Sequence, residues 1–229
     1  MTAPPASPTR RAVLVHVAAR VAESHARRLA VDGVDGAGKT IFADELAGTL
    51  RAAGREVVRV SVDGFHQPPE LRYHRGRASP EAFWLDSYDY DRFCDDVLAP
   101  FAPGGDRTYR RAIRDVETNQ RVDVEPETAS TDALLIVDGI FLHRDELAGC
   151  WDFSIFLDVG FDVTFARLAR RDGFPADPAA PANRRYLEGQ RLYLAACRPG
   201  EQADVVIDNT DPERPRLVGP RTGSAGTGS

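Results

Sequence analysis

The stretch from residue 33 to residue 40 constrains the fold of this chain more than any other part. It reads GVDGAGKT and fits the Walker A pattern G-x-x-x-x-G-K-[ST] without a gap. An apolar run at 29–32 precedes it and a helix-like run at 40–50 follows, so the glycines lie between a strand and a helix. Glycines there let successive backbone N–H groups point at a phosphate, and the helix N-terminus adds positive potential. The sequence therefore predicts a phosphate-binding loop for a nucleotide.

The basic residues support this interpretation. Of the 29 lysines and arginines, Lys39 is the only lysine. Its ammonium can reach between β- and γ-phosphate oxygens, where a planar guanidinium has a different shape and reach. The neighbouring Thr40 hydroxyl is expected to hold Mg²⁺. ATP and Mg²⁺ are thus the predicted cofactors, and the residues expected to contact the nucleotide are Gly33, Asp35, Gly36, Ala37, Gly38, Lys39 and Thr40.

Strand-like and helix-like runs alternate along the chain, which predicts an α/β fold: a mainly parallel sheet with helices on both faces. The 229 residues suit a single domain at 11–218 that includes a small helical lid at about 162–190. The N-terminal residues 1–10 and the Gly/Ser/Thr-rich tail 219–229 are expected to be disordered. Strands are predicted at 29–32, 56–62, 108–114, 134–138, 151–159 and 203–207, and helices at 11–24, 40–50, 91–98, 162–172 and 184–196.

Two aspartates follow predicted strands directly. Asp63 comes after VVRVSV and Asp138 after LLIV. Ligands of open α/β sheets bind beyond the carboxyl ends of the strands, so both carboxylates should face the phosphate loop. We assign Asp63 as the base that accepts the proton of an attacking hydroxyl, and Asp138 as the carboxylate on the Mg²⁺ side. Because glycine follows each of them, turn formation is the alternative explanation.

The segment 63–93 is dense in aromatic, arginine, histidine and aspartate side chains. It is too polar for a core and too aromatic for a plain linker. This mixture favours a pocket in which rings hold a flat or sugar-like ligand and carboxylates bind its hydroxyls. An ordered surface loop with packing aromatics is the alternative. The candidates for contact with the acceptor are His66, Tyr73, Asp86, Tyr88 and Asp89.

A cluster of arginines marks the predicted lid. Arg167, Arg170 and Arg171 fall at i, i+3 and i+4 of the helix at 162–172 and so share one face. The Pro/Ala-rich loop that follows would let this face close over phosphates, with Arg167 and Arg171 as catalytic groups. A solvated charged face is the alternative.

Other features exclude several classes of protein. A guanine-reading Asn-Lys-x-Asp tetrad needs a second lysine, which argues against a GTPase. The net charge of −6 argues against a nucleic-acid partner. No apolar run approaches the roughly 20 residues of a membrane span. Three widely spaced cysteines form no metal pattern and no disulfide framework, so we expect a cytoplasmic protein; a homo-oligomer remains open.

The chain resembles the uridine kinase/phosphoribulokinase/pantothenate kinase superfamily, and within it the bacterial uridine kinase-like proteins. The resemblance runs from about residue 29 to residue 211. It is carried by VDGVDGAGKT, SVDGFH, RYHRGRASPEAF with DSYDYDRF, LLIVDGIFL, ARLARRDG with RYLEGQRLY, and ADVVIDNTD. It implies the P-loop kinase fold, with Asp63 as the base and an aspartate of the next segment on the acceptor hydroxyls. Asp86 is the nearest match, and Asp89 competes because SYD also resembles the pantothenate kinase pattern.

The chain also departs from the family pattern. Asp138 stands where nucleoside kinases often carry glutamate, and Ile41 replaces the usual second hydroxyl residue after the loop. In the hairpin before the strand at 134–138 the family places a tyrosine and a histidine that read the base; here Tyr109 is present and the histidine is not. The resemblance therefore implies an ATP-dependent kinase of a small hydroxylated molecule, with uridine or cytidine as the first expectation. Pantothenate, another nucleoside or a sugar-like acceptor is the alternative, and a non-catalytic nucleotide-binding regulator is the second alternative.

Overall fold

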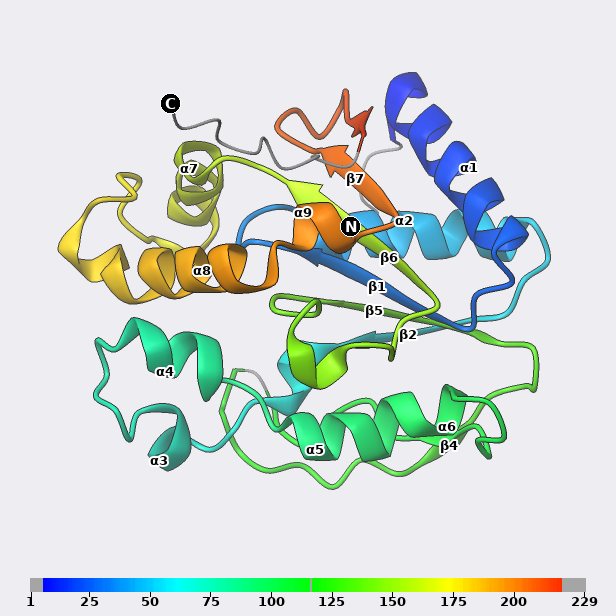
Figure 1. Ribbon diagram of the computed structural model, residues 1–229, viewed down its shortest axis with the longest axis horizontal. Helices are drawn as coiled ribbons and strands as arrows, with labels where there is room; N and C mark the ends of the chain where they lie inside the picture. Colours follow the sequence, from blue (N-terminus) through cyan, green and yellow to red (C-terminus); the bar gives the residue numbers. More distant parts are fainter. Residues whose placement is uncertain (1–5, 116, 220–229) are drawn as a thin grey trace, which may run out of the picture.

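The computed structural model describes residues 6–115 and 117–219, and its centre is a six-stranded sheet (Figure 1). Five strands run parallel, and the last pairs antiparallel at one edge. This confirms the predicted mainly parallel α/β sheet. The spatial order is β2 (Val57–Ser61), β5 (Leu134–Gly139), β1 (Arg28–Gly33), β6 (Phe153–Asp158), β7 (Val205–Asp208) and β8 (Arg216–Val218).

Helices cover both faces of the sheet. The face towards α1 (Pro8–Glu23) and α2 (Lys39–Ala52) buries Leu29 and Val31 of β1. The intervening Ala30 belongs to the opposite core, which packs against η2 (Cys94–Leu98) and α8 (Arg184–Cys197). Alternate side chains of a strand point to opposite faces, so a strand buried on both sides reads as a continuous apolar run, as LLIV of β5 does.

The remaining elements are short. Those before β5 are η1 (Val62–Phe65), α3 (Pro69–Arg72), α4 (Pro80–Leu85), α5 (Tyr90–Phe93), α6 (Ala99–Phe101), β3 (Thr108–Tyr109) and β4 (Glu127–Thr128). Those after it are η3 (Asp145–Leu147), α7 (Phe161–Asp172), η4 (Pro181–Asn183) and α9 (Pro199–Gln202). In Figure 1, α4, α7 and α8 gather at the left, where the parallel strands end. This is the end at which sequence reasoning places the ligands.

Two predicted boundaries need correction. The first helix begins at Pro8, so residues 8–10 belong to the folded domain and not to a disordered N-terminus; Ser7 caps the helix by accepting a hydrogen bond from Arg10 N at 3.1 Å. The predicted strand at 108–114 is only Thr108–Tyr109, because its partner β4 offers just two residues for pairing. Residues 1–5 of the predicted disordered N-terminus, and nearly all of the predicted disordered tail, lie outside the described residues.

Two general features bear on the site. Among the described residues, no helix is long and apolar enough to cross a membrane. The three cysteines are free thiols, and burial raises the pKa of Cys94 and of Cys197 to about 11. These two thiols therefore stay protonated near neutral pH and are poor nucleophiles.

Candidate active site

The phosphate loop joins β1 to α2, and its glycines are required by geometry. Gly36 and Gly38 have φ angles of 78° and 91°, which side chains with a Cβ rarely adopt. A Cβ on Gly36 would lie 2.7 Å from the Thr164 carbonyl oxygen of α7. The first N–H groups of α2 have no intrahelical acceptor, so they remain available to an anion at this end of the helix.

The side chain of Lys39 folds back onto the phosphate loop. Its Nζ donates to the Val34 carbonyl oxygen at 3.0 Å and lies 4.0 Å from the Asp35 carboxylate. Burial raises the pKa of Asp35 above its usual range, while Lys39 opposes that shift and Asp63 adds to it. The carboxylate of Asp63 is therefore close enough to the phosphate loop to act on Asp35 through space. A polyphosphate would compete with Val34 and Asp35 for the ammonium.

Thr40 and Asp138, the two predicted metal ligands, are in direct contact. The Thr40 hydroxyl donates to Asp138 Oδ2 at 2.6 Å, and Arg59 Nη2 donates to Oδ1 at 2.8 Å. Asp138 is only 2% exposed, and strand register places it beside Val31 of β1 and Ser61 of β2. Hydroxyl and carboxylate oxygens suit Mg²⁺, which usually takes one or two protein ligands and completes its shell with water and phosphate.

Asp63 follows β2 and is held by a second side chain. The Tyr88 hydroxyl donates to Asp63 Oδ1 at 2.8 Å, and the Asp63 N–H donates to Ser61 Oγ at 3.3 Å. Burial beside this carboxylate raises the pKa of Tyr88 well above its usual value, so the hydroxyl stays a donor. Asp63 itself is half-buried, and its second oxygen can accept the proton of an acceptor hydroxyl.

Replacing Tyr88 by phenylalanine should lower kcat about three- to tenfold, because the carboxylate loses the hydrogen bond that orients it. The KM for ATP should stay within about twofold, because the tyrosine contacts the base and not the phosphate loop. Steady-state kinetics with ATP varied at saturating acceptor measures both quantities. Tyr109→Phe is the matched control, since it removes the hydroxyl of a second tyrosine of similar residue exposure, whose partner is Glu127. Equal losses in the two variants would contradict the role given to Tyr88.

His66 completes the wall beside the base. Its Nδ1 lies 2.7 Å from the Asp63 carbonyl oxygen, and its ring packs on Tyr88 with centroids 4.6 Å apart. Burial lowers the pKa of His66, an effect that Asp63 opposes. The ring is therefore neutral near pH 7, and it can offer its other nitrogen to a polar ligand without adding charge.

The two predicted lid arginines differ in their contacts. Arg167 donates to the carbonyl oxygens of Gly36 at 3.0 Å and of Asn209 at 2.9 Å, so it ties α7 to the phosphate loop. Arg171 is exposed and pairs with its neighbour Asp172, with its Nη2 at 2.8 Å from Oδ2. Asp172 raises the pKa of Arg171, and Asp35 adds to this effect. Arg171 is therefore the one of the two that can turn towards a phosphate without breaking backbone contacts.

A cavity of about 390 Å³ lies beside the phosphate loop. Ile41, on the first turn of α2, leaves 63% of its surface exposed there, although it is apolar. Arg10 of α1 closes the far wall through bonds to Glu45 at 2.5 Å and to the Pro212 carbonyl oxygen at 2.9 Å. An apolar slot next to a phosphate site suits the base of a nucleotide. Its lining is Ala6, Arg10, Gly36, Gly38, Ile41, Glu45, Arg167, Leu168, Arg171, Asn209, Pro212 and Glu213.

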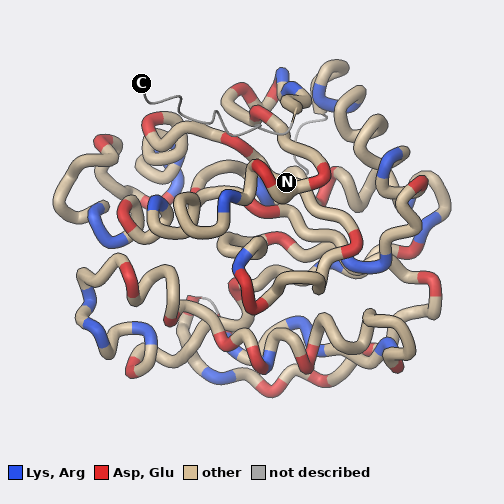
Figure 2. The backbone as a smooth tube through the Cα atoms, in the orientation of Figure 1, with Lys and Arg blue, Asp and Glu red and all other residues tan. Residues whose placement is uncertain are grey.

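The acceptor candidates are only partly brought to this site. Asp86 is engaged by Arg75 Nε at 2.9 Å, and Asp89 caps α5 by accepting from the Arg92 N–H at 3.0 Å. Tyr73 is surrounded by guanidinium groups, with that of Arg77 4.8 Å from its ring centroid. Figure 2 shows several basic positions along the segment that carries α3 and α4. Each of these bonds uses one carboxylate oxygen, Oδ2 of Asp86 and Oδ1 of Asp89, so a hydroxyl would have to reach the other.

Tyr109, a predicted acceptor-binding residue, has its ring in the core. Its side chain is 3% exposed, packs on Phe101 in the core, and donates to Glu127 at 3.0 Å while it accepts from Arg111 at 2.8 Å. With ring and hydroxyl both engaged, it lines no open acceptor site. The family resemblance located the hairpin but not the direction of this side chain.

Sequence reasoning missed several residues that support the site. Arg59 holds Asp138, and its signal was an arginine between valines in β2. The side chain of Gln190 accepts from the Asp35 N–H at 2.7 Å. Below the loop, Asp32 accepts from the Gly33 N–H at 2.6 Å and from His143 Nδ1 at 2.7 Å. Gln190 and His143 lie far along the chain from the loop, with no local pattern that would reveal them.

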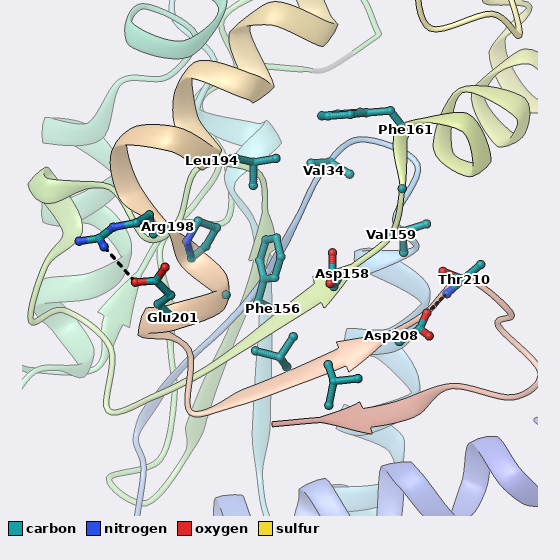
Figure 3. A pocket seen from close by; sticks show the side chains of 15 residues that line it. Val34, Phe156, Asp158, Val159, Phe161, Leu194, Arg198, Glu201, Asp208 and Thr210 are labelled. Atoms are coloured by element: carbon teal, nitrogen blue, oxygen red, sulfur yellow. Dashed lines mark hydrogen bonds and ion pairs between the residues drawn. The ribbon is translucent and has the colours of Figure 1, made fainter. Parts of the chain in front are cut away.

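A second hollow of about 580 Å³ borders the phosphate loop at Val34 (Figure 3). Its polar groups are largely engaged with one another: Arg198 pairs with Glu201 at 3.1 Å, and Asp208 accepts from the Thr210 N–H at 3.0 Å. It is lined by Val34 of the loop but by none of the predicted site residues. None of the groups assigned above to phosphoryl transfer therefore lines this hollow.

Comparison with known proteins agrees with this geometry. The family model described as the phosphoribulokinase / uridine kinase family matches residues 29–174. A chloroplastic uridine/cytidine kinase of Arabidopsis thaliana is 26% identical over 155 residues, which cover 63% of this chain. The match spans 29% of that relative's own length.

Two solved structures share the fold. A protein described as a possible uridine kinase from Bacillus stearothermophilus superposes with a TM-score of 0.68 at 22% identity, over 86% of this chain and 97% of its own. A protein described as a candidate fructose transport system kinase from Silicibacter sp. TM1040 gives 0.64 at 24% identity, over 80% and 95%. At these identities the likeness establishes the P-loop kinase architecture and not the substrate.

Proposed function

Because this chain belongs to the phosphoribulokinase / uridine kinase family, we propose that it transfers the γ-phosphate of ATP to a primary hydroxyl of a small molecule, with uridine and cytidine as the first acceptors. The observation that carries the proposal is the Asp63 carboxylate, oriented by Tyr88 and electrostatically coupled to Asp35 of the phosphate loop. A base, a phosphate loop and a pair of metal-ligand oxygens at one end of a sheet are the parts that phosphoryl transfer needs.

In the proposed reaction, Asp63 accepts the proton of the acceptor hydroxyl while its oxygen forms a bond to the γ-phosphorus. The bond from that phosphorus to the bridging β–γ oxygen breaks, and ADP leaves. Lys39 leaves Val34 to contact the β- and γ-phosphates, and Arg171 closes from α7 to stabilise the transferred group. Catalysis then consists of positioning and charge neutralisation.

The residues present fit Mg²⁺. Thr40 Oγ1 and Asp138 Oδ2 are 2.6 Å apart beside the N-terminus of α2, and Arg59 keeps the carboxylate in place. Thr40 and Asp138 would hold Mg²⁺, which would neutralise the negative charge that develops on the phosphate oxygens. Among the described residues, no group of three or more His, Cys, Asp or Glu side chains forms a denser metal site.

A different acceptor is favoured by one observation. Tyr109, which the resemblance assigns to reading a base, is buried and engaged by Glu127 and Arg111. Pantothenate, another nucleoside or a sugar-like molecule therefore remains the second candidate class. A regulator without turnover would have no use for the oriented Asp63.

An ADP-release assay with ATP and Mg²⁺ against uridine, cytidine, other nucleosides, pantothenate and simple sugars tests the proposal. Fast turnover with uridine or cytidine supports the first acceptor class. Turnover only with another compound would support a kinase whose acceptor is neither uridine nor cytidine. ATP binding without turnover on any acceptor would contradict the enzyme and favour the regulator.

A further inference from the structure

Helix α8 is hydrogen bonded to the phosphate loop and to the residue that precedes it. The side chain of Gln190 is 1% exposed; its Oε1 accepts from the Asp35 N–H at 2.7 Å, and its Nε2 donates to the Tyr186 carbonyl oxygen at 2.9 Å. One turn later the Tyr193 hydroxyl donates to Asp32, the residue before the loop. Both ends of the amide of Gln190 are thus satisfied inside the protein, and the loop is fixed through a backbone N–H rather than a side chain.

The same helix is bonded to the acceptor segment. Arg185 is 8% exposed and donates to the carbonyl oxygens of Arg77 at 3.1 Å, Ser79 at 3.3 Å and Arg72 at 3.4 Å. A Cβ on Gly189 would lie 2.7 Å from the Pro80 carbonyl oxygen, so α8 and α4 approach as closely as glycine permits. Figure 1 shows α4 facing α8 at the carboxyl end of the sheet. This segment leads directly to Tyr88, which orients the base.

We propose that Gln190 is a positioning residue that sets the distance between the phosphate loop and the acceptor segment. It acts through the Asp35 N–H on one side and through the body of α8, anchored by Arg185 and Gly189, on the other. The side-chain amide of Gln190 bonds to the Asp35 N–H and the Tyr186 carbonyl oxygen, and to neither the predicted base nor the predicted metal ligands. The functional part of this inference rests on the proposed phosphoryl transfer.

The physical reason is that in-line transfer requires the acceptor oxygen and the γ-phosphorus to be held about 3 to 3.5 Å apart. The phosphate is expected to bind at the loop after β1, and the acceptor at the segment after β2. Arg167 and Asn209 also hold this glycine-rich loop, but neither belongs to the helix that holds the acceptor segment, so their bonds alone would let the two segments move independently. A buried hydrogen bond at the loop apex, made from a rigid helix that also holds the acceptor segment, removes that freedom.

The claim that Gln190 holds the phosphate loop through the Asp35 N–H can be tested without any substrate. In Gln190→Leu the Asp35 amide should exchange with solvent deuterium about tenfold faster than in the wild type, because its acceptor is gone. In Gln190→Glu a carboxyl oxygen remains at the same place, so most of the protection should return. Gln120→Leu, which changes an exposed glutamine between β3 and β4, should exchange like the wild type. Unchanged exchange at Asp35 in Gln190→Leu would overturn the positioning role.

The functional part is tested by the number of acceptor molecules phosphorylated per ADP released. In Gln190→Leu this ratio and kcat should both fall about tenfold, because transfer to the acceptor needs the fixed distance and attack by water does not. Gln190→Glu should regain most of the ratio, with a higher KM for ATP from its added negative charge. Faster exchange at Asp35 with an unchanged ratio would overturn this part. Absence of turnover in the wild type would instead refute the proposed function and leave the exchange result as the measure of the positional role.

Discussion

The variant Asp63→Asn should lose about 10³-fold in kcat while it keeps its affinity for ATP, because the amide has the size of the carboxylate but cannot accept the proton of the hydroxyl. The contact with Tyr88 can persist through the amide oxygen, so the local packing is preserved. Asp63 lies beyond β2 and makes no bond to the phosphate loop, so nucleotide binding should change little. Single-turnover kinetics for kcat and titration with a fluorescent ATP analogue for affinity measure the two effects.

Asp132→Asn supplies the matched control for that experiment. Asp132 is 91% exposed in its side chain and precedes β5, at the end of the sheet opposite the phosphate loop. It should behave as the wild type in both assays. If Asp63→Asn kept turnover within about threefold of the wild type, the assignment of the base would be wrong, because general-base catalysis contributes at least about 10²-fold.

The parts of the site that could be predicted from the sequence are those encoded by neighbouring residues in the chain. The phosphate loop is a contiguous pattern in which each residue has its own requirement, so GVDGAGKT identified both the loop and the helix that it starts. Asp63 and Asp138 were predictable because parallel strands align their carboxyl ends, and the register indeed pairs Ser61 with Asp138. Alternation of strands and helices was sufficient for that inference without knowledge of the strand order.

The side chains that contact these groups come from distant parts of the chain, and no local sequence pattern predicts such contacts. Gln190 reaches the Asp35 amide across 155 residues, and no periodicity in either segment records the contact. Asp86 looked available from its composition alone, yet Arg75 eleven residues earlier engages it. Tyr109 shows the limit of a family resemblance: position in a hairpin does not determine whether a side chain faces the ligand or the core, and here Glu127 and Phe101 hold it in the core.

The variant Lys39→Ala should lose about 10² to 10³-fold in kcat/KM whichever acceptor is used, because it removes one preorganised cation from the developing phosphate charge. Lys39→Arg should recover little of this, since the guanidinium is planar and larger than the ammonium, and Nζ of the lysine already lies within the loop at 3.0 Å from the Val34 carbonyl oxygen. Kinetics with the best acceptor of the panel compares the three proteins. A variant of Lys39 within about threefold of the wild type would show that no phosphate contact depends on it.

Because Lys39 is the only lysine of the chain, its contact with ATP can also be observed directly. Reductive methylation with ¹³C-formaldehyde labels the α-amino group and this one side chain, and the charge is retained. Addition of ATP and Mg²⁺ should shift the Lys39 methyl resonance, as the ammonium leaves Val34 and Asp35 for the phosphates, and leave the α-amino resonance unchanged. Lys39→Arg identifies the signal by its loss. If saturating ATP moved neither resonance, the lysine would remain on the loop backbone, and the charge neutralisation assigned to it would have to come from Arg171 and Mg²⁺ alone.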